Sequence, residues 1–377
     1  MTGVPIINVN NNCSTGSSAL ALAAQSVQAG QVDCALALGF EKMAPGSLGS
    51  AFNDRAAPME GTISQLFEIE GEKEYKEDDF GPFAARIFGA AGQEYCEKYG
   101  ANWDHIAEIA AKNHKHSKDN PYAQFRNTPT GAECSKARKI TREVTLPMCS
   151  PTSDGGAAAV IVSEAFVKKH NLQDRAVELA GIGIATDSAR LYEDRSRIEL
   201  AGADMSRRAA ERAYKQAGIG PSDVQVLELH DCFAPNELVT YDALGLCPEG
   251  QGHKIVENGD NTHGGKWLIN PSGGLESKGH PLGATGIAMV KYMVDQVRGE
   301  AGPMQAKNVK NALTHNIGLG GSCVVTVLRK PEFFKDGGKC KDRFGYEAGY
   351  ECQRISEEDL NKVKSKKQFS EYLPAKL

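Results

Sequence analysis

The sequence has 377 residues, of which 41% are hydrophobic and 24% are charged, and its formal net charge is −5 at pH 7. This composition is typical of a globular protein with room for two domains. The mildly acidic balance argues against nucleic-acid binding and against electrostatic docking on anionic membranes. No apolar run approaches the ~20 residues that a membrane-spanning helix needs, so we expect no stable membrane insertion. The ten cysteines are scattered, without a CxxC pair or a zinc-type Cys/His spacing, so we expect free thiols and no metal site.

The first 42 residues predict the alternating strands and helices of an α/β fold. Pro5–Val9 is typical of a short buried strand, residues 10–12 of its turn, and Ser14–Ala29 of the following helix. Val32–Leu38 is another apolar run of strand length. The 40 glycines cluster with Ser, Ala and Asn, as expected for close turns at the ends of such elements.

Residues 43–142 differ in character from the segments around them. They are richer in charged and aromatic side chains, with helical patterns at Phe83–Tyr99 and Trp103–His114. We therefore expect an inserted, mostly helical subdomain. After it the small-residue character returns near Cys149, and Gly155-Gly156 predicts a tight turn into a strand at Ala157–Val162.

The second half of the chain returns to the α/β pattern. In order, the expected elements are the helix Leu200–Ala217, the strand Val224–Leu229, the helix Gly279–Val297, and a Gly-rich turn and Val-rich strand within Ala312–Leu328. Residues 331–377 are charged and Lys-rich and predict an appended tail. The expected domains are an N-terminal half (1–42 and 143–170), the insertion (43–142), a C-terminal half (171–330) and the tail (331–377).

Two pairs of motifs suggest that the halves are duplicates. Cys13-Ser-Thr-Gly16 opens one small-residue helix, and His280-Pro-Leu-Gly283 opens another with the same spacing. The Gly155-Gly156 turn likewise matches Gly320-Gly321. A duplication would place Cys13 and His280 at equivalent helix N-termini, facing each other across a pseudo-two-fold axis.

Cys13 is the first candidate for chemistry. A helix N-terminus offers free N–H groups and positive partial charge, and both favour the nucleophilic thiolate. The Asn, Ser, Thr and Gly residues around it suit a tight turn that a substrate can approach. A buried structural cysteine remains the commoner fate of an isolated Cys.

Two histidines and a second cysteine follow later in the chain. His280 precedes Pro281 at a helix start, where it can act as a base or as a hydrogen-bond donor. His230 and Cys232 follow a strand and can point into one cleft at the carboxyl edge of a sheet. Purely structural roles stay open for each of them, and the pair is too small for a metal site without further ligands.

The Gly318-Leu-Gly-Gly321 turn exposes backbone N–H groups that could hold an oxyanion, although such turns are common. Nucleophiles and bases at element ends fit acyl transfer through a thioester. No serine-hydrolase elbow, phosphate-binding loop, zinc signature or dinucleotide fingerprint competes with this interpretation.

Four motifs together resemble the thiolases, and most closely their sterol carrier protein 2-type branch. They are Asn10-Asn-Asn-Cys13-Ser-Thr-Gly, His230-Asp-Cys-Phe233, Gly279-His-Pro-Leu-Gly283 and Gly318-Leu-Gly-Gly321. The His-Asp-Cys-Phe tetrapeptide is the feature of that branch, because other thiolases usually carry Asn-Glu-Ala-Phe there. The resemblance covers about residues 1–330.

The resemblance implies a five-layer αβαβα fold of two similar halves with an inserted loop domain. It also implies thiolytic cleavage of 3-ketoacyl-CoA, with CoA as a substrate and no cofactor. Cys13 would form the acyl-enzyme, His280 would activate it, and His230 and His280 would stabilise the enolate oxygen. The amides of Cys13 and Gly320 would hold the tetrahedral oxyanion. Ser150 would lie where the family contacts pantetheine.

The usual acid/base cysteine of the family would stand at Gly318, so it is absent and Cys232 would replace it. Only twelve residues precede Cys13, where the family has a strand–helix–strand portion, so we expect an exposed sheet edge. We expect no lipid-carrier domain, because the tail of 331–377 is too short for one.

The resemblance also implies a homodimer and a peroxisomal location. Ala375-Lys376-Leu377 resembles the Ser-Lys-Leu address that the peroxisomal import receptor reads. Two alternatives stay open. One is a condensing enzyme with a similar Cys/His/His site, against which Cys232 argues. The other is an inactive chain that only binds acyl-CoA or pairs with a full-length subunit.

Overall fold

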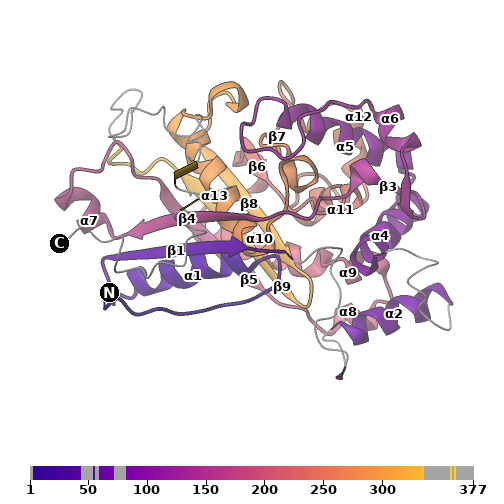
Figure 1. Cartoon of the computed structure of the whole chain (residues 1–377), viewed down its shortest axis with the longest axis horizontal. Helices are drawn as coiled ribbons and strands as arrows, with labels where there is room; N and C mark the ends of the chain where they lie inside the picture. Colours follow the sequence, from indigo (N-terminus) through magenta and orange to yellow (C-terminus); the bar gives the residue numbers. More distant parts are fainter. Residues whose placement is uncertain are drawn as a thin grey trace.

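Two β-sheets and a pair of helices between them form the centre of the molecule (Figure 1). The computed structural model describes residues 3–43, 54–55, 59–71, 82–334, 357, 358 and 361. The larger sheet has the order β5-β9-β8-β6-β7, and the smaller pairs β1 with β4. The strand bounds are β1 Cys34–Glu41, β4 Gly155–Val162, β5 Glu178–Ala185, β6 Val226–Glu228, β7 Leu268–Ile269, β8 Asn311–Gly318 and β9 Ser322–Arg329.

The five-stranded sheet is covered on both faces. Strands β8 and β9 form an antiparallel hairpin that ends at the pair Gly318↔Ser322, while β6 runs parallel to both β8 and β7. All residues of β8 except Asn311 are buried. A sheet buried on both faces selects near-continuous apolar strands, which is why the β9 sequence is rich in Val.

Helices α1 (Thr15–Gln28) and α13 (Leu282–Arg298) lie between the two sheets. Glycines allow this close packing. A Cβ atom on Gly16 would lie 2.9 Å from the carbonyl oxygen of Gly283, and one on Gly39 of β1 would lie 2.2 Å from the same oxygen. The small-residue character read from the sequence therefore reflects contact between α1, α13 and β1.

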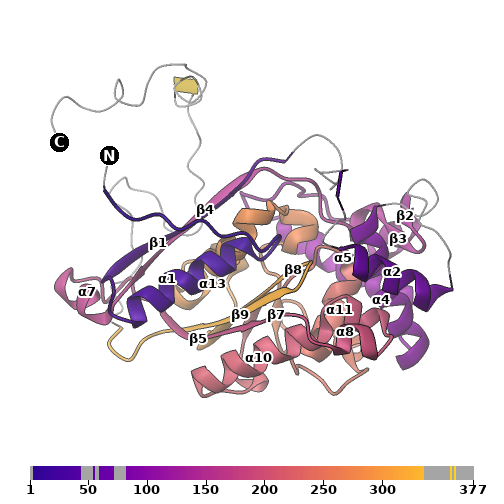
Figure 2. The ribbon, with the colours of Figure 1, turned by 90° about the horizontal axis from the view of Figure 1, so that it is seen from below.

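Helix α10 (Ala203–Ala217) covers the other face of the large sheet. A Cβ atom on Gly183 of β5 would lie 1.9 Å from the carbonyl oxygen of Ala209, so glycine is required there. Figure 2 shows the resulting order of layers: the β1–β4 sheet, α1 with α13, the five-stranded sheet, and α10. The expected α/β fold of the thiolase type is confirmed, and the described residues form four of its five expected layers.

The outward face of the β1–β4 sheet is apolar and open to solvent. Leu36, Leu38 and Phe40 of β1 are 62%, 58% and 73% exposed, and Val160 of β4 is 65% exposed. The register places Leu36 opposite Val160, so these side chains form one continuous patch. Within the described ranges, nothing covers this face.

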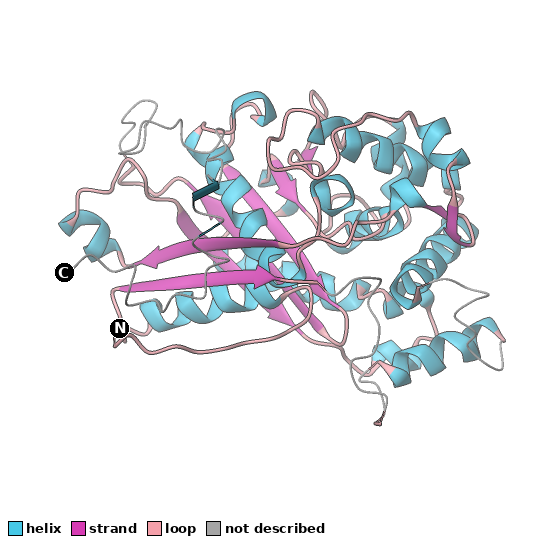
Figure 3. Ribbon diagram, viewed as in Figure 1, coloured by secondary structure: helices cyan, strands magenta, loops and turns pink. Residues whose placement is uncertain are grey.

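Helices gather at one end of the molecule, beside the carboxyl end of the large sheet (Figures 1 and 3). They pack on one large core that includes Phe88, Ile106 and Leu238. The helices at this end are α2 Glu60–Glu70, α4 Phe83–Tyr99, α5 Trp103–Ser117, α6 Gly131–Lys136, α11 Ala234–Ala243 and α12 Gly252–Glu257, with the small strands β2 Lys139–Thr141 and β3 Val144–Thr145.

The remaining helical elements are short. They are α7 Glu164–Lys169, α8 Arg190–Glu193, α9 Arg197–Leu200, the single turns η1 Leu146–Met148, η2 Pro221–Asp223 and η4 Gly302–Met304, and the π-helix η3 Gly274–Lys278. Among the described helices, none is long and apolar enough to cross a membrane.

Several predicted elements differ from the structure. The predicted strand Pro5–Val9 is wrong: the segment pairs with no strand in the described part of the chain, and Ile6 is 84% exposed. The helix predicted from Leu200 is interrupted at Gly202, whose φ of +91° favours glycine and separates α9 from α10. The predicted tail and Ala375-Lys376-Leu377 lie almost wholly outside the described residues.

Candidate active site

Cys13 and His280 lie at the starts of the two central helices. Cys13 precedes α1 by two residues, and His280 precedes α13 by two residues. The two helices touch in their first turns, because Gly16 packs on Gly283 and Ile287. The expectation that two equivalent helix starts would bring these side chains together agrees with this arrangement.

A tight elbow presents Cys13. Asn12 has a φ of +53°, and the N–H of Ser14 donates to the carbonyl oxygen of Asn11 at 3.1 Å. Cys13 is 7% exposed, and burial raises the pKa of its thiol to about 12. Desolvation therefore outweighs the helix N-terminus that the sequence argument invoked, and at neutral pH the thiol needs a base to become a nucleophile.

The imidazole of His280 is the tautomer whose Nε2 can accept a proton. The Thr285 hydroxyl donates to the carbonyl oxygen of Pro281 at 3.0 Å, so it can only accept from Nδ1–H of His280, 2.8 Å away. The proton is thus on Nδ1. The opposite nitrogen, Nε2, is buried and has no hydrogen-bond partner among the described residues. Burial, assisted by Lys278, lowers the pKa of His280 to about 3, so the imidazole is neutral.

His230 has the opposite tautomer. Asn316 of β8 accepts from the Ser17 hydroxyl through Oδ1 at 2.9 Å, which directs its Nδ2 donor to Nδ1 of His230 at 3.0 Å. Nδ1 is then an acceptor, and the proton of His230 is on Nε2. Burial and the neighbouring His280 hold the pKa of His230 well below its usual value.

The three groups converge. The Cys13 sulfur and one nitrogen each of His230 and His280 all lie within 4.8 Å of one another. The two imidazole rings are 5.1 Å apart between centroids and nearly perpendicular, at 85°. The site therefore combines a buried thiol, a neutral base and a neutral N–H donor.

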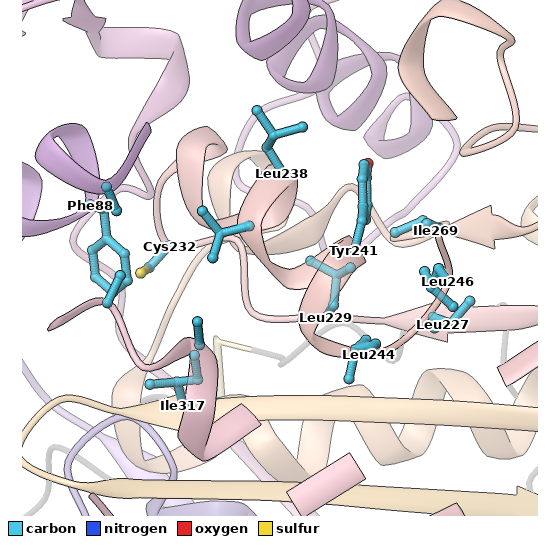
Figure 4. Packing of buried hydrophobic residues seen from close by; sticks show 14 of the residues in the cluster. Phe88, Leu227, Leu229, Cys232, Leu238, Tyr241, Leu244, Leu246, Ile269 and Ile317 are labelled. Atoms are coloured by element: carbon cyan, nitrogen blue, oxygen red, sulfur yellow. The ribbon is translucent and has the colours of Figure 1, made fainter. Parts of the chain in front are cut away.

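Cys232 is also buried at this site. It is 6% exposed and lies in the large hydrophobic cluster with Phe88 (Figure 4). Burial holds the pKa of the Cys232 thiol well above its usual value, and the negative charge that Cys13 carries when ionised raises this pKa further. The protonated thiol is the form that can give a proton to a carbanion.

The Gly318–Gly321 turn packs on the Cys13 elbow. Asn12 donates through Nδ2 to the carbonyl oxygen of Leu319 at 3.1 Å. A Cβ atom on Gly318 would lie 2.1 Å from the carbonyl oxygen of Asn11, so this backbone has no room for a cysteine there. Gly320 is exposed, with a φ of +97°.

The segment of residues 149–153 joins the loop of Cys232 to the loop of His280. The N–H of Ser150 donates to the carbonyl oxygen of Cys232 at 2.9 Å. The N–H of His280 donates to the Ser153 hydroxyl at 3.0 Å, and Ser153 in turn donates to Gln124 at 2.7 Å. The predicted contact of Ser150 with pantetheine stays a prediction.

A buried polar layer lies behind the site. Asp231 accepts from the N–H of Leu275 in η3 at 2.8 Å and from Nδ2 of Asn113 in α5 at 3.0 Å. It thereby connects the His230–Cys232 loop with the π-helix that precedes His280. Burial and the Glu237 charge raise the pKa of Asp231 to about 8, and the buried Lys112 pairs with Glu237.

Sequence reasoning missed the residues that fix the two tautomers. Asn316 follows Thr314 and His315 in a strand that is buried from residue 312 to residue 318, and polar side chains in a buried strand were a usable signal. Thr285 lies inside a small-residue helix, where nothing in the sequence distinguishes it. Asp231 stood between two singled-out residues and received no role of its own.

This fold and this site define the thiolase-fold class of proteins. Residues 1–143 match the family described as Thiolase, N-terminal domain, and residues 185–330 match Thiolase C-terminal domain-like. Sterol carrier protein 2 of Rattus norvegicus is 54% identical over 329 residues, 87% of this chain and 59% of that protein. The chain thus spans about three fifths of the length of this relative.

Two further comparisons agree. The benzoylsuccinyl-CoA thiolase subunit BbsB of Thauera aromatica is 35% identical over 85% of this chain and 77% of that protein. The solved structure of an Ltp2-ChsH2(DUF35) aldolase superposes with a TM-score of 0.69 at 21% identity, covering 85% of this chain and 79% of that chain, and shows the fold alone. The chain belongs to the thiolase family, and the resemblance to its sterol carrier protein 2 branch is confirmed.

Proposed function

We propose that the chain is an acyltransferase that cleaves 3-ketoacyl-CoA with free CoA, giving a shortened acyl-CoA and acetyl- or propionyl-CoA. The unpartnered Nε2 of His280 beside the buried thiol of Cys13 carries the proposal. A base of this tautomer can take the thiol proton directly. One relative named a thiolase and another named an acetyl-CoA acetyltransferase support the same reaction class.

In the first half-reaction, the Cys13 thiol gives its proton to Nε2 of His280, and the sulfur attacks the 3-keto carbon. The amides of Cys13 and Gly320 hold the oxyanion. The bond between C2 and C3 then breaks, leaving an acyl-Cys13 thioester and the enolate of acetyl- or propionyl-CoA. The Nε2–H groups of His230 and of protonated His280 stabilise the enolate oxygen, and Cys232 protonates its carbon.

In the second half-reaction, the Cys232 thiolate takes the proton of free CoA. The CoA sulfur attacks the acyl-Cys13 thioester, and the Cys13 thiolate leaves and regains its proton from His280. Each group returns to its starting state, so no cofactor is consumed. Ser150 would contact the pantetheine arm near the loop of Cys232.

Substitution of the nucleophile tests the proposal. We expect Cys13→Ala to lose thiolysis of a 3-ketoacyl-CoA, read as loss of its enolate absorbance, because no acyl-enzyme can form. Cys34→Ala, which removes an exposed cysteine on β1, is the matched control and should keep the wild-type rate. Undiminished turnover by Cys13→Ala would exclude the proposed mechanism.

A second candidate function is supported by the open face of the β1–β4 sheet and by the exposed segment of residues 3–8. In this second candidate function, the chain binds acyl-CoA without turnover or pairs with a full-length subunit. Circular dichroism and thermal melting of the isolated chain separate the two. A cooperative native-like melt with turnover favours the enzyme, and a broad melt without turnover favours the second candidate.

We also propose a homodimer and a role in peroxisomal fatty-acid or sterol side-chain β-oxidation. The apolar patch of Leu36, Leu38, Phe40 and Val160 supports association, and Ala375-Lys376-Leu377 supports import through the peroxisomal receptor. Fluorescence microscopy of the tagged chain with and without Leu377 tests the location. Loss of peroxisomal signal is expected without Leu377.

A further inference from the structure

The active site is also a set of three metal ligands. The Cys13 sulfur and one nitrogen from each of His230 and His280 lie within 4.8 Å of one another, and all three side chains are buried. Around a tetrahedral zinc ion, such donors stand about 3.3–3.6 Å apart, as bond lengths of ~2.0–2.3 Å require. Closing a separation of 4.8 Å to this range shortens it by about 1.2–1.5 Å, which the two side chains can share.

One ligand atom already faces the cluster with nothing bound to it. Nε2 of His280 has no hydrogen-bond partner in the described part of the chain, and the residue is only 5% exposed. A buried polar atom without a partner costs free energy, which a metal ion at this position would recover. The fixed Nδ1–H···Thr285 hydrogen bond leaves the Nε2 lone pair pointing into the site.

The surroundings have the form of an outer ligand shell. Metal-bound imidazoles usually hydrogen-bond through their second nitrogen, as His280 does to Thr285. His230 would need Nδ1–H toward Asn316, and a half-turn of the Asn316 amide supplies an oxygen acceptor there. The Ser17 hydroxyl can follow this rotation, since it can accept as well as donate.

We propose that Cys13, His230 and His280 bind one zinc ion and that the bound ion blocks acyl transfer. Zinc prefers thiolate and imidazole ligands in a four-coordinate site. Binding replaces the Cys13 thiol proton, which leaves to solvent, and a water molecule completes the four ligands. The two groups that perform the chemistry, the sulfur and the Nε2 of His280, are then both occupied.

Cobalt(II) is the probe, because its absorption reports the ligands without any need for turnover. Titration of the metal-free protein with CoCl2 should give one equivalent of tetrahedral, intensely coloured complex with a thiolate charge-transfer band. Zinc should displace the cobalt. We expect Cys13→Ser to lose the charge-transfer band, and His280→Ala to weaken binding by tenfold or more.

A second set of variants tests the hydrogen-bond partner of His280 in the same cobalt titration. Thr285→Val should weaken cobalt binding by about 10–100-fold, the usual effect of losing a second-shell partner. His253→Ala, which changes a histidine of α12 that packs on His105 of α5, should bind cobalt as the wild type does. If Cys13→Ser does not fold, as judged by circular dichroism, wild-type protein alkylated with iodoacetamide takes its place.

The inference is overturned if cobalt binds without a thiolate band, or if Cys13→Ser and the alkylated protein bind it as the wild type does. Inhibition is the second measurement. Zinc at ten times its dissociation constant should lower the thiolysis rate about elevenfold, and EDTA should restore it. Cobalt binding to a chain without thiolase activity would remove the proposed function and leave the metal site standing.

Discussion

Two hydrogen-bond chains decide which nitrogen of each active-site imidazole carries a proton. The chain Pro281–Thr285–His280 leaves Nε2 of His280 as a base, and the chain Ser17–Asn316–His230 leaves Nε2 of His230 as a donor. Two identical side chains thus receive different tasks from their neighbours. Because both imidazoles are neutral and buried, these partners matter more than charge.

Thr285 is therefore a positioning residue for the proposed base. Thr285→Val keeps the shape of the side chain but removes the acceptor that holds the His280 proton on Nδ1. The imidazole can then place its proton on Nε2, where it cannot accept from Cys13. We expect kcat to fall tenfold or more with KM nearly unchanged, and the melting temperature to stay within a few degrees.

The conservative variant is the control for this prediction. Thr285→Ser keeps the hydroxyl and should retain most of the wild-type kcat. Steady-state kinetics of both variants, with thermal melts, provide the measurement. Equal kcat values for the Val and Ser variants would show that the hydroxyl has no part in positioning His280.

At this scale the sequence located the candidate site residues better than it located the side chains that hydrogen-bond to them. Cys13, His230, Cys232 and His280 stood at predicted element ends, and the structure brings Cys13, His230 and His280 within 4.8 Å. Asn316 and Thr285 could not be assigned roles, because their effect depends on the side chain across from them in space. The residue pattern along one helix or strand indicates that a reactive side chain stands at its end. The pattern does not indicate which side chain of another helix or strand hydrogen-bonds to it.

The π-helix η3 is the element that places a carboxyl group under the site. Glu276 is fully buried, and burial, followed by the nearby charges of Asp231 and Glu237, raises its pKa well above the usual value of 4.5. The folded protein therefore keeps a proton on Glu276 at pH values where the unfolded chain has lost it. This raised pKa costs stability as the pH rises.

The direction of the pH dependence of stability follows from the number of protons that the folded and unfolded states hold. Below pH 4.5 both states hold the proton, and above that value only the folded state does until its own pKa is reached. The unfolding free energy then falls by up to about 1.4 kcal/mol per pH unit. Glu276→Gln removes this dependence, so its stability relative to the wild type should rise with pH.

Urea denaturation at pH 5 and pH 8 measures the effect. We expect Glu276→Gln to be close to the wild type at pH 5 and more stable at pH 8, by no more than about 4 kcal/mol. A loss of stability that is equal at both pH values would mean that Glu276 is ionised in the folded protein.

Helices were the elements that the sequence predicted well. α4 has the bounds expected from its pattern, because an apolar face with 3.6-residue spacing is a local property. Strand Pro5–Val9 failed because a strand also needs a neighbour to bond with, and an apolar run does not reveal whether one exists. Strand β1 ends at Glu41, three residues later than expected, because its pairing with β4 continues to that residue.

At the scale of the whole molecule, the open face of the β1–β4 sheet is the feature without an internal explanation. Its opposite face carries Ala37 and Gly39 against α13, whereas Leu36, Leu38 and Phe40 point outward. A contiguous apolar patch with this composition marks an interaction surface in a stable protein. The proposed homodimer would cover it.

The last prediction concerns this patch. The double substitution Leu38→Asp and Phe40→Asp places two charges on it, and burying a charge in an interface costs several kcal/mol. We expect the dissociation constant of the dimer to rise by a hundredfold or more, measured by sedimentation equilibrium. Leu146→Asp, at a residue 50% exposed in η1 at the helical end, is the matched control and should leave the dimer intact. Because Leu38 and Phe40 point away from α1 and α13, the monomer should keep its fold by circular dichroism. If both variants associate as the wild type does, the patch is not the dimer interface.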